Sequence, residues 1–315
     1  MANENGVAGT WYANGKLLIS GEYLVLRGAK ALAIPLRFGQ SLTVSLNKGE
    51  PVLHWTAKIP GSTWFTAQFN TETFDLLSAS DVVPASRLRS ILQTIREMKP
   101  DFLTHVAEIR VSTELNFPPE WGIGSSSSLM ANISRWAGVD PFELNRRIFG
   151  GSGYDIAAAL SKHPIIYHLE KGIPVFENID FYPPSPDHIW LVYQNKKEDS
   201  QAAVSRFSET EVPSTAVETI SEITRRLSTS KNFIEFSQLL TEHESLIAQI
   251  LQQKPVRESL FPDFEGSIKS LGAWGGDFLL AASPLHETYV RDYFRHKGFS
   301  TLFRYDELAL PAKQS

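Results

Sequence analysis

Residues 119–128 read PEWGIGSSSS, the most informative stretch of this sequence. Two glycines, Gly122 and Gly124, stand before four consecutive serines. An apolar pattern with helical spacing then continues to Gly138. The stretch therefore predicts a glycine-rich turn that leads directly into a helix.

Such a turn is suited to binding phosphate. A helix N-terminus presents unpaired N–H groups and about half a positive charge, so it attracts anions. Glycines let the backbone wrap a phosphate, and serine hydroxyls add donors or a magnesium ligand. The alternative is an ordinary turn with a serine N-cap, for which one serine would suffice. The candidate phosphate-binding residues are Gly122, Gly124, Ser125, Ser126 and Ser127.

Two better-known glycine motifs are absent from the sequence. The P-loop pattern GxxxxGK[ST] does not occur, and Asn14-Gly15-Lys16-Leu17 lacks its upstream glycine and its hydroxyl residue. The nucleophile-elbow pattern GxSxG is also missing.

Asp155 and Lys16 are the candidate catalytic residues. Asp155 lies in GSGYDIAAA (151–159), in the first turn of an expected helix whose dipole favours the ionised carboxylate. It could accept a hydroxyl proton or position a substrate, or it could be an ordinary first-turn aspartate. Lys16 opens the apolar strand in NGKLLISGEYLVL (14–26), where it could neutralise a transferring phosphoryl group or simply be solvated.

Composition limits the remaining possibilities. The 315 residues carry a net charge of −5, no cysteine and 42% apolar residues, as in a globular protein of one or two domains. Thiol chemistry is excluded, and the acidic balance gives no reason to expect a nucleic-acid partner. Neither a signal peptide nor an apolar run of about 20 residues is visible, so we expect a cytoplasmic protein with no membrane partner.

The order of expected elements indicates an α+β fold. Strands are predicted at 16–20, 23–26, 31–36, 52–56, 106–115, 165–169 and 173–179, with a helix at 85–99. After a proline-rich linker at 182–187, we expect strands at 189–193, 278–282 and 299–305. Helices are expected at 214–227, at 233–251 with caps Asn232 and Glu235, and at 284–297. The second half suits a small α+β sandwich.

Together these segments resemble the GHMP kinases, the family of galactokinase, homoserine kinase, mevalonate kinase and phosphomevalonate kinase. The resemblance rests on NGKLLISGEYLVL, PEWGIGSSSS, GSGYDIAAA and LGAWGGD (271–277) in this order, and it spans residues 14–283. Within the family, the tyrosine after Gly-Glu and the GYDIA string look closest to phosphomevalonate kinases.

The resemblance implies a two-domain fold with ATP and substrate between the domains. Residues 1–184 would form an N-terminal domain like ribosomal protein S5 domain 2, and residues 185–315 a ferredoxin-like domain. ATP phosphates would lie in the 122–128 loop, with Mg²⁺ at Ser126. Asp155 would face the acceptor hydroxyl beside Lys16, and Gly272 and Gly275 would support the loop and a substrate phosphate.

The implied activity is transfer of the γ-phosphoryl group of ATP to a small-molecule hydroxyl or phosphate acceptor, with mevalonate or phosphomevalonate as the first candidates. Homoserine or a sugar is the alternative acceptor, and the chain would be a monomer or a homodimer. Three departures from the family pattern stand out. The 125–155 stretch is short, the family's magnesium glutamate has only Glu143 as a counterpart, and Trp274 and Asp277 replace small residues. A non-catalytic nucleotide- or metabolite-binding protein is therefore the second hypothesis.

Overall fold

The computed structural model describes residues 7–104 and 108–310, which fold into two compact units. Of the described residues, the first unit contains 7–15, 38–104, 108–119 and 124–160. The second contains residues 16–37, 120–123 and 161–310. The boundary predicted at 184 lies inside the second unit, so it stays a prediction.

The first unit is built on a mixed sheet with the strand order β5-β4-β3-β6-β2. Strand β3 pairs with β4 in an antiparallel hairpin and with β6 in parallel, and β6 pairs with the second part of β2. Parallel neighbours need a crossover connection, which α1 supplies between β5 and β6. The bounds are β2 Ala31–Asn47, β3 Val52–Ile59, β4 Ser62–Asn70, β5 Leu76–Ala79, β6 Glu108–Leu115 and α1 Val82–Met98. Residues 106 and 107 of the predicted strand lie outside the described residues.

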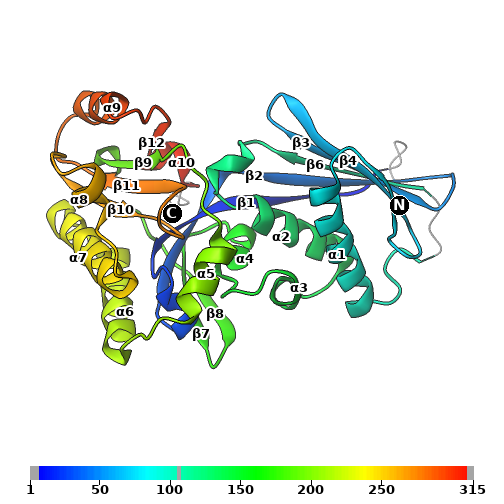
Figure 1. The fold of residues 1–315 in the computed structure, drawn as a ribbon, viewed down its shortest axis with the longest axis horizontal. Helices are drawn as coiled ribbons and strands as arrows, with labels where there is room; N and C mark the ends of the chain where they lie inside the picture. Colours follow the sequence, from blue (N-terminus) through cyan, green and yellow to red (C-terminus); the bar gives the residue numbers. More distant parts are fainter. Residues whose placement is uncertain (1–6, 105–107, 311–315) are drawn as a thin grey trace. The chain divides into compact units, whose positions relative to one another are not determined.

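Four helices cover one face of this sheet (Figure 1). They are α1, α2 (Ser125–Ala137), α3 (Pro141–Ile148) and α4 (Tyr154–Leu160). Their apolar side chains share a core with strand residues such as Trp55 and Phe69. The opposite face is polar and carries an open hollow of about 710 Å³. Leu42 and Val44 of β2 alternate with polar residues and are buried, whereas Leu46 near the strand end is exposed.

The second unit contains a four-stranded antiparallel sheet with the order β10-β11-β9-β12. Several helices connect β9 to β10, a tight turn joins β10 to β11, and α9 connects β11 to β12. This βαββαβ arrangement is the ferredoxin-like topology that was expected for the C-terminal part. The bounds are β9 Ile189–Tyr193, α5 Ser200–Ser208, α6 Ser214–Thr229, α7 Phe233–Leu251, α8 Val256–Leu260, β10 Ser267–Ser270, β11 Phe278–Ala282, α9 Glu287–His296, β12 Leu302–Arg304 and α10 Tyr305–Leu308.

Both faces of this sheet are covered, with α6 and α7 on one side and α9 on the other (Figure 1). Trp190 and Val192 of β9 share a core with Val290 and Phe294 of α9. On the other side, α7 packs against α6 and against β10.

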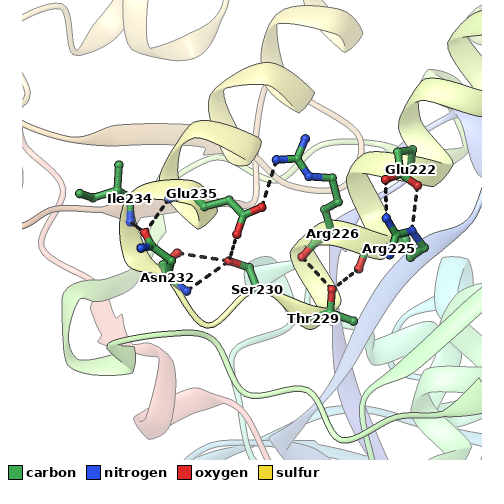
Figure 2. A network of polar contacts seen from close by, with 8 residues as sticks. All are labelled: Glu222, Arg225, Arg226, Thr229, Ser230, Asn232, Ile234 and Glu235. Atoms are coloured by element: carbon green, nitrogen blue, oxygen red, sulfur yellow. Dashed lines mark hydrogen bonds and ion pairs between the residues drawn. The ribbon is translucent and has the colours of Figure 1, made fainter.

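The turn from α6 to α7 is fixed by side-chain caps (Figure 2). The Asn232 side chain accepts hydrogen bonds from the N–H groups of Ile234 (2.9 Å) and Glu235 (3.0 Å), which confirms the predicted cap. Glu235 in turn accepts from Ser230 Oγ (2.9 Å) and from Arg226 (3.0 Å). These contacts define where α7 begins and therefore which of its residues face β10.

The rest of the second unit holds the first part of β2, which pairs with β7, and the β7–β8 hairpin. The strand predicted at 23–26 is wrong. Residues Leu24–Arg27 form the 3₁₀ helix η1, because Gly21 and Tyr23 take positive φ values of 93° and 61° and turn the chain sharply. The strand predicted at 299–305 shortens to β12, which α10 follows. Further bounds are β1 Val7–Ser20, η2 Pro119–Trp121, β7 Ile165–Glu170, β8 Ile173–Asn178 and η3 Pro186–His188.

Candidate functional site

The four serines of residues 125–128 divide into two pairs with different surroundings. Ser127 and Ser128 are buried, and their hydroxyls donate to the Gly124 carbonyl at 3.2 and 2.8 Å. Ser128 also donates to Gln40 Oε1 at 3.2 Å. Both hydroxyls are therefore engaged with the backbone of the first turn of α2, as donors to a carbonyl three or four residues earlier and not as N-caps, which accept from an N–H.

Ser125 and Ser126 remain available at the helix N-terminus. Ser125 is half-buried and Ser126 is exposed, and neither hydroxyl has a side-chain hydrogen bond within the part of the chain that the structure describes. Gly124 precedes them as the N-cap with φ 108°, a backbone conformation that strongly favours glycine. The first N–H groups of α2 and these hydroxyls together form a site with the donor chemistry of an anion-binding helix end.

Asp155 lies in the first turn of α4, as predicted, and is partly exposed. Helix α4 packs directly against α2. The contact is made by small side chains, Ala131 of α2 and Ala159 of α4, together with Ala13 of β1. Small residues allow the close approach of the two helices, so the helix that carries Asp155 and the helix that carries the serines are fixed to each other.

Glu143, the predicted magnesium ligand, has its carboxylate engaged by arginines of its own helix. Arg146 donates to both oxygens at 2.8 Å, and Arg147 donates to Oε1 at 2.7 Å. The two guanidinium groups lower the pKa of Glu143 to about 2. Across residues 7–104 and 108–310, no group of three or more His, Asp or Glu side chains is arranged to hold a metal ion. Glu143 would have to release its arginines before it could bind one.

Three segments that are far apart in the sequence meet around Lys16 in the second unit. The Lys16 N–H donates to the Ile123 carbonyl at 2.8 Å, which joins the first glycine segment to the second. The Asp277 carboxylate, from the third segment, lies directly against Gly122, where a Cβ would overlap Oδ1. The positive charge of Lys16 counteracts the burial that raises the pKa of Asp277. Gly122 is therefore required for this approach as well as for its φ of 69°.

The third glycine segment is a strained loop filled by a tryptophan. Gly272 and Gly275 have φ values of 66° and 93°, and Trp274 and Asp277 also have positive φ values, 49° and 57°. The Trp274 side chain is buried at 6% exposure. The Tyr23 hydroxyl donates to the Ala273 carbonyl at 2.6 Å and ties the loop to the first segment. Burial and the charge of Glu198 raise the pKa of Tyr23 to about 12, so the hydroxyl stays a donor at neutral pH.

A buried charged cluster adjoins this loop, and no motif of the sequence indicates it. Glu22, Lys269 and His243 have no exposed surface, and Lys269 Nζ donates to Glu22 Oε1. His243 Nε2 lies 3.2 Å from Glu22 Oε2. Burial raises the pKa of Glu22, while burial and the charge of Lys269 hold the pKa of His243 well below its ordinary range. The short run Ser-Ile-Lys-Ser gave no signal of this burial, because a lysine is ordinarily exposed to solvent.

Several solved structures are similar in fold to nearly the whole chain. An L. major mevalonate kinase bound to R-mevalonate matches with a TM-score of 0.66 at 18% identity, over 99% of both chains. A Streptococcus pneumoniae phosphomevalonate kinase bound to phosphomevalonate and AMPPNP matches with a TM-score of 0.68 at 14% identity, over 94% of this chain and 99% of that chain. The mevalonate kinase of Methanococcus jannaschii has a TM-score of 0.68 at 14% identity, over 94% and 96%. No protein-family model and no curated protein sequence matches the chain.

These full-length matches show that the chain has the two-domain GHMP kinase fold, as the ordered motifs predicted. Among the described residues, no helix has both the length and the hydropathy needed to cross a lipid bilayer. The predicted site residues fall into two sets. The first unit holds Gly124, Ser125, Ser126, Ser127, Glu143 and Asp155, and the second holds Lys16, Gly122, Gly272 and Gly275.

Proposed function

We propose that this chain is an ATP- and magnesium-dependent kinase of the GHMP type, which transfers the γ-phosphoryl group to a hydroxyl or phosphate of a small molecule. The observation that carries the proposal is the convergence of Lys16, Gly122 and Asp277 from three separate motifs of the sequence. Nothing in the stability of a turn or a strand requires these three segments to meet. Phosphoryl transfer does require such a set, because it depends mainly on positioning and charge neutralisation.

The N-terminus of α2 is the proposed binding site for the ATP phosphates. Its free hydroxyls on Ser125 and Ser126 and its N–H groups supply donors, and Gly122 and Gly124 let the backbone approach the phosphates. Magnesium usually takes only one or two protein ligands and completes its shell with phosphate oxygens and water. Ser126 fits that role, whereas Glu143 could contribute only after leaving its two arginines.

Asp155 is the proposed partner of the acceptor hydroxyl, as base or as orienting group, and Lys16 the proposed cation that neutralises developing charge. Gly272 and Gly275 would allow the third loop to approach the acceptor. This set is sufficient for phosphoryl transfer without a covalent nucleophile.

Mevalonate or phosphomevalonate is the acceptor that we propose first, since similar structures carry these ligands. Homoserine and sugars are the alternatives. We further propose that the protein works in the cytoplasm, as a monomer or homodimer, with no nucleic-acid or membrane partner.

A coupled ADP-release assay with mevalonate, phosphomevalonate, homoserine and a sugar panel tests the proposal. We expect magnesium-dependent turnover with one acceptor class. Asp155→Asn should reduce kcat by at least 100-fold while ATP still binds, and Asp292→Asn, which alters an exposed aspartate of α9, should leave turnover unchanged. Full activity of Asp155→Asn would overturn the role assigned to this residue.

The second candidate function is nucleotide or metabolite binding without catalysis. It is favoured by the buried Trp274 in the third loop and by the Asp277 carboxylate that already faces Lys16. This candidate predicts thermal stabilisation by ATP with no ADP release for any acceptor. Magnesium-dependent transfer to one acceptor would eliminate it.

A further inference from the structure

A continuous set of buried polar contacts joins the first glycine segment to the strand that leads into the third. The Gly21 N–H donates to His243 Nε2 at 2.9 Å, and the adjacent Glu22 carboxylate accepts from Lys269. Lys269 also donates to the Ser270 carbonyl at 2.8 Å. Ser270 is the last residue of β10, and the third loop follows it directly.

The contacts continue into α7 through Glu244. Its carboxylate accepts from the Ser270 N–H (2.9 Å) and the Ser270 hydroxyl (3.0 Å), and also from the Val256 N–H (3.1 Å). His243 and Glu244 are adjacent on α7, so one helical turn holds both the Gly21 turn and the end of β10. The start of the third loop is therefore fixed from two directions.

The far side of the same loop is tied to the same turn. Tyr23 follows Glu22, and its hydroxyl donates to the Ala273 carbonyl at 2.6 Å. Residues 21–23 thus contact the strand before the loop through Glu22 and the loop itself through Tyr23. A change in the position of this turn would move both contacts together.

Stability alone does not account for buried charges at this place. Removing ionised groups from water is costly, and a well-packed neutral replacement of a buried ion pair is often neutral or stabilising. Directional, charge-assisted hydrogen bonds do, however, fix geometry more sharply than apolar contacts. The cluster combines complete burial with contacts on both sides of one strained loop.

We propose that Glu22 and Lys269 are positioning residues, which hold the turn at 21–23 and the third glycine loop in one register. They act through Tyr23 and Ser270 and do not themselves contact a substrate. The consequence for catalysis rests on the proposed kinase function, because that function assigns the loop to the acceptor. The consequence for the loop itself is independent of it.

Hydrogen exchange measured by mass spectrometry tests the proposal without any substrate. The variant E22Q/K269M removes both charges with little change in shape. We expect peptides covering 271–277 to exchange at least tenfold faster, since the Leu271 and Asp277 N–H groups are hydrogen-bonded only while the loop keeps its register. Peptides from β3 and β4 in the first unit should be unchanged. The matched control, E222Q/R225M, removes an exposed pair of α6 and should change nothing (Figure 2).

Tyr23→Phe provides the second variant, which removes a single hydroxyl. It should accelerate exchange over 271–277 in the same way, and adding it to E22Q/K269M should produce little further change, because both variants release the same contact. Independent, additive effects or unchanged exchange over 271–277 would overturn the proposal. If E22Q/K269M does not fold, E22Q alone can replace it, because it keeps a side-chain acceptor for Lys269, and it should give an intermediate acceleration. Unchanged exchange over 271–277, or an effect that adds to that of Tyr23→Phe, would again overturn the proposal.

Kinetics then separate this proposal from the proposed function. In an active enzyme, E22Q/K269M should raise the KM for the acceptor at least fivefold while the KM for ATP stays within twofold. A general loss of structure would lower kcat and affect both substrates. Faster loop exchange in a protein without kinase activity would leave the positioning role intact and remove the kinase proposal alone.

Discussion

Replacing Lys269 by methionine should lower the free energy of unfolding, because it removes the cation that is paired with the buried Glu22 carboxyl. The substitution keeps most of the apolar stem but leaves the Glu22 carboxyl fully buried without its cation. A buried carboxylate without a partner takes up a proton rather than stay ionised. With an ordinary glutamate pKa of about 4.3 and about 1.36 kcal/mol per pH unit, protonation at pH 7 costs about 3.7 kcal/mol.

His243 could take up the proton in place of Glu22, because its Nε2 lies 3.2 Å from Glu22 Oε2. Protonating an imidazole of ordinary pKa costs only about 0.7 kcal/mol at pH 7. It also removes the acceptor of the buried Gly21 N–H, and such an unsatisfied donor costs about 1–3 kcal/mol. By either route the loss of stability at pH 7 is about 2–4 kcal/mol.

Urea unfolding followed by circular dichroism can measure this loss against E22Q/K269M. Both variants lack the hydrogen bond from Lys269 to Ser270, so their difference reports the uncompensated carboxyl. Burial raises the pKa of Glu22 in the folded state, so the folded chain binds a proton that the unfolded chain has released, and stability falls as pH rises above about 4.3. The gap should be about 2–4 kcal/mol at pH 7 and about 1 kcal/mol at pH 5. A gap below about 1 kcal/mol at pH 7, or one that does not shrink at pH 5, would refute the reasoning.

Three further predictions concern single residues. The pKa of His243 is lowered in the folded chain, so below about pH 6.5 the unfolded chain binds a proton that the folded chain does not. The difference in free energy of unfolding between the wild type and His243→Gln, measured in urea, should therefore shrink by up to about 2 kcal/mol between pH 7 and pH 5. Gly122→Ala should destabilise the chain by at least about 1–2 kcal/mol from its positive φ alone, and Asp277→Ala added to it should recover the part due to the clash. Ser126→Ala should weaken MgATP binding in calorimetry with stability within about 0.5 kcal/mol of wild type, whereas Ser128→Ala should lower stability by about 1 kcal/mol.

Each of these predictions has a contrary outcome. An advantage over His243→Gln that is constant with pH would mean that His243 titrates normally in the folded chain. If Gly122→Ala/Asp277→Ala is no more stable than Gly122→Ala, the Asp277 carboxylate does not lie against Gly122. Equal effects of the two serine substitutions on MgATP binding would contradict the division of the serine run into ligand-facing and structural residues.

Local patterns predicted most of the elements because their causes are local. Helix α7 begins at the predicted cap, since Asn232 needs only the N–H groups of the next residues. The apolar spacing of 85–99 likewise marks the buried face of α1. Short elements such as β5, β10 and α5 were missed, because a few residues without a strong periodicity carry too little signal.

A backbone bend changed one further expectation, and strand pairing changed another. The residues after Gly21 have strand-like composition, yet positive φ values at Gly21 and Tyr23 convert them into η1. The strands expected at 16–20 and 31–36 belong to the much longer β1 and β2, whose lengths depend on which neighbours pair with them. Strand pairing is a long-range property, so composition within one window does not determine it.

Sequence patterns indicated which residues are candidates for phosphate chemistry, because glycine, serine, lysine and aspartate can serve that chemistry through their own backbone freedom and functional groups. For the second half the local patterns indicated an α+β arrangement without β10, and the ferredoxin-like fold was implied by the family resemblance. Only the tertiary structure showed which residues these side chains contact. It divided the serine run into two pairs, engaged Glu143 with arginines, placed Asp277 on Gly122 and paired Glu22 with a lysine 247 positions away. Burial and pairing arise from segments brought together by folding, and their energies depend on distances and on water exclusion that no local pattern contains.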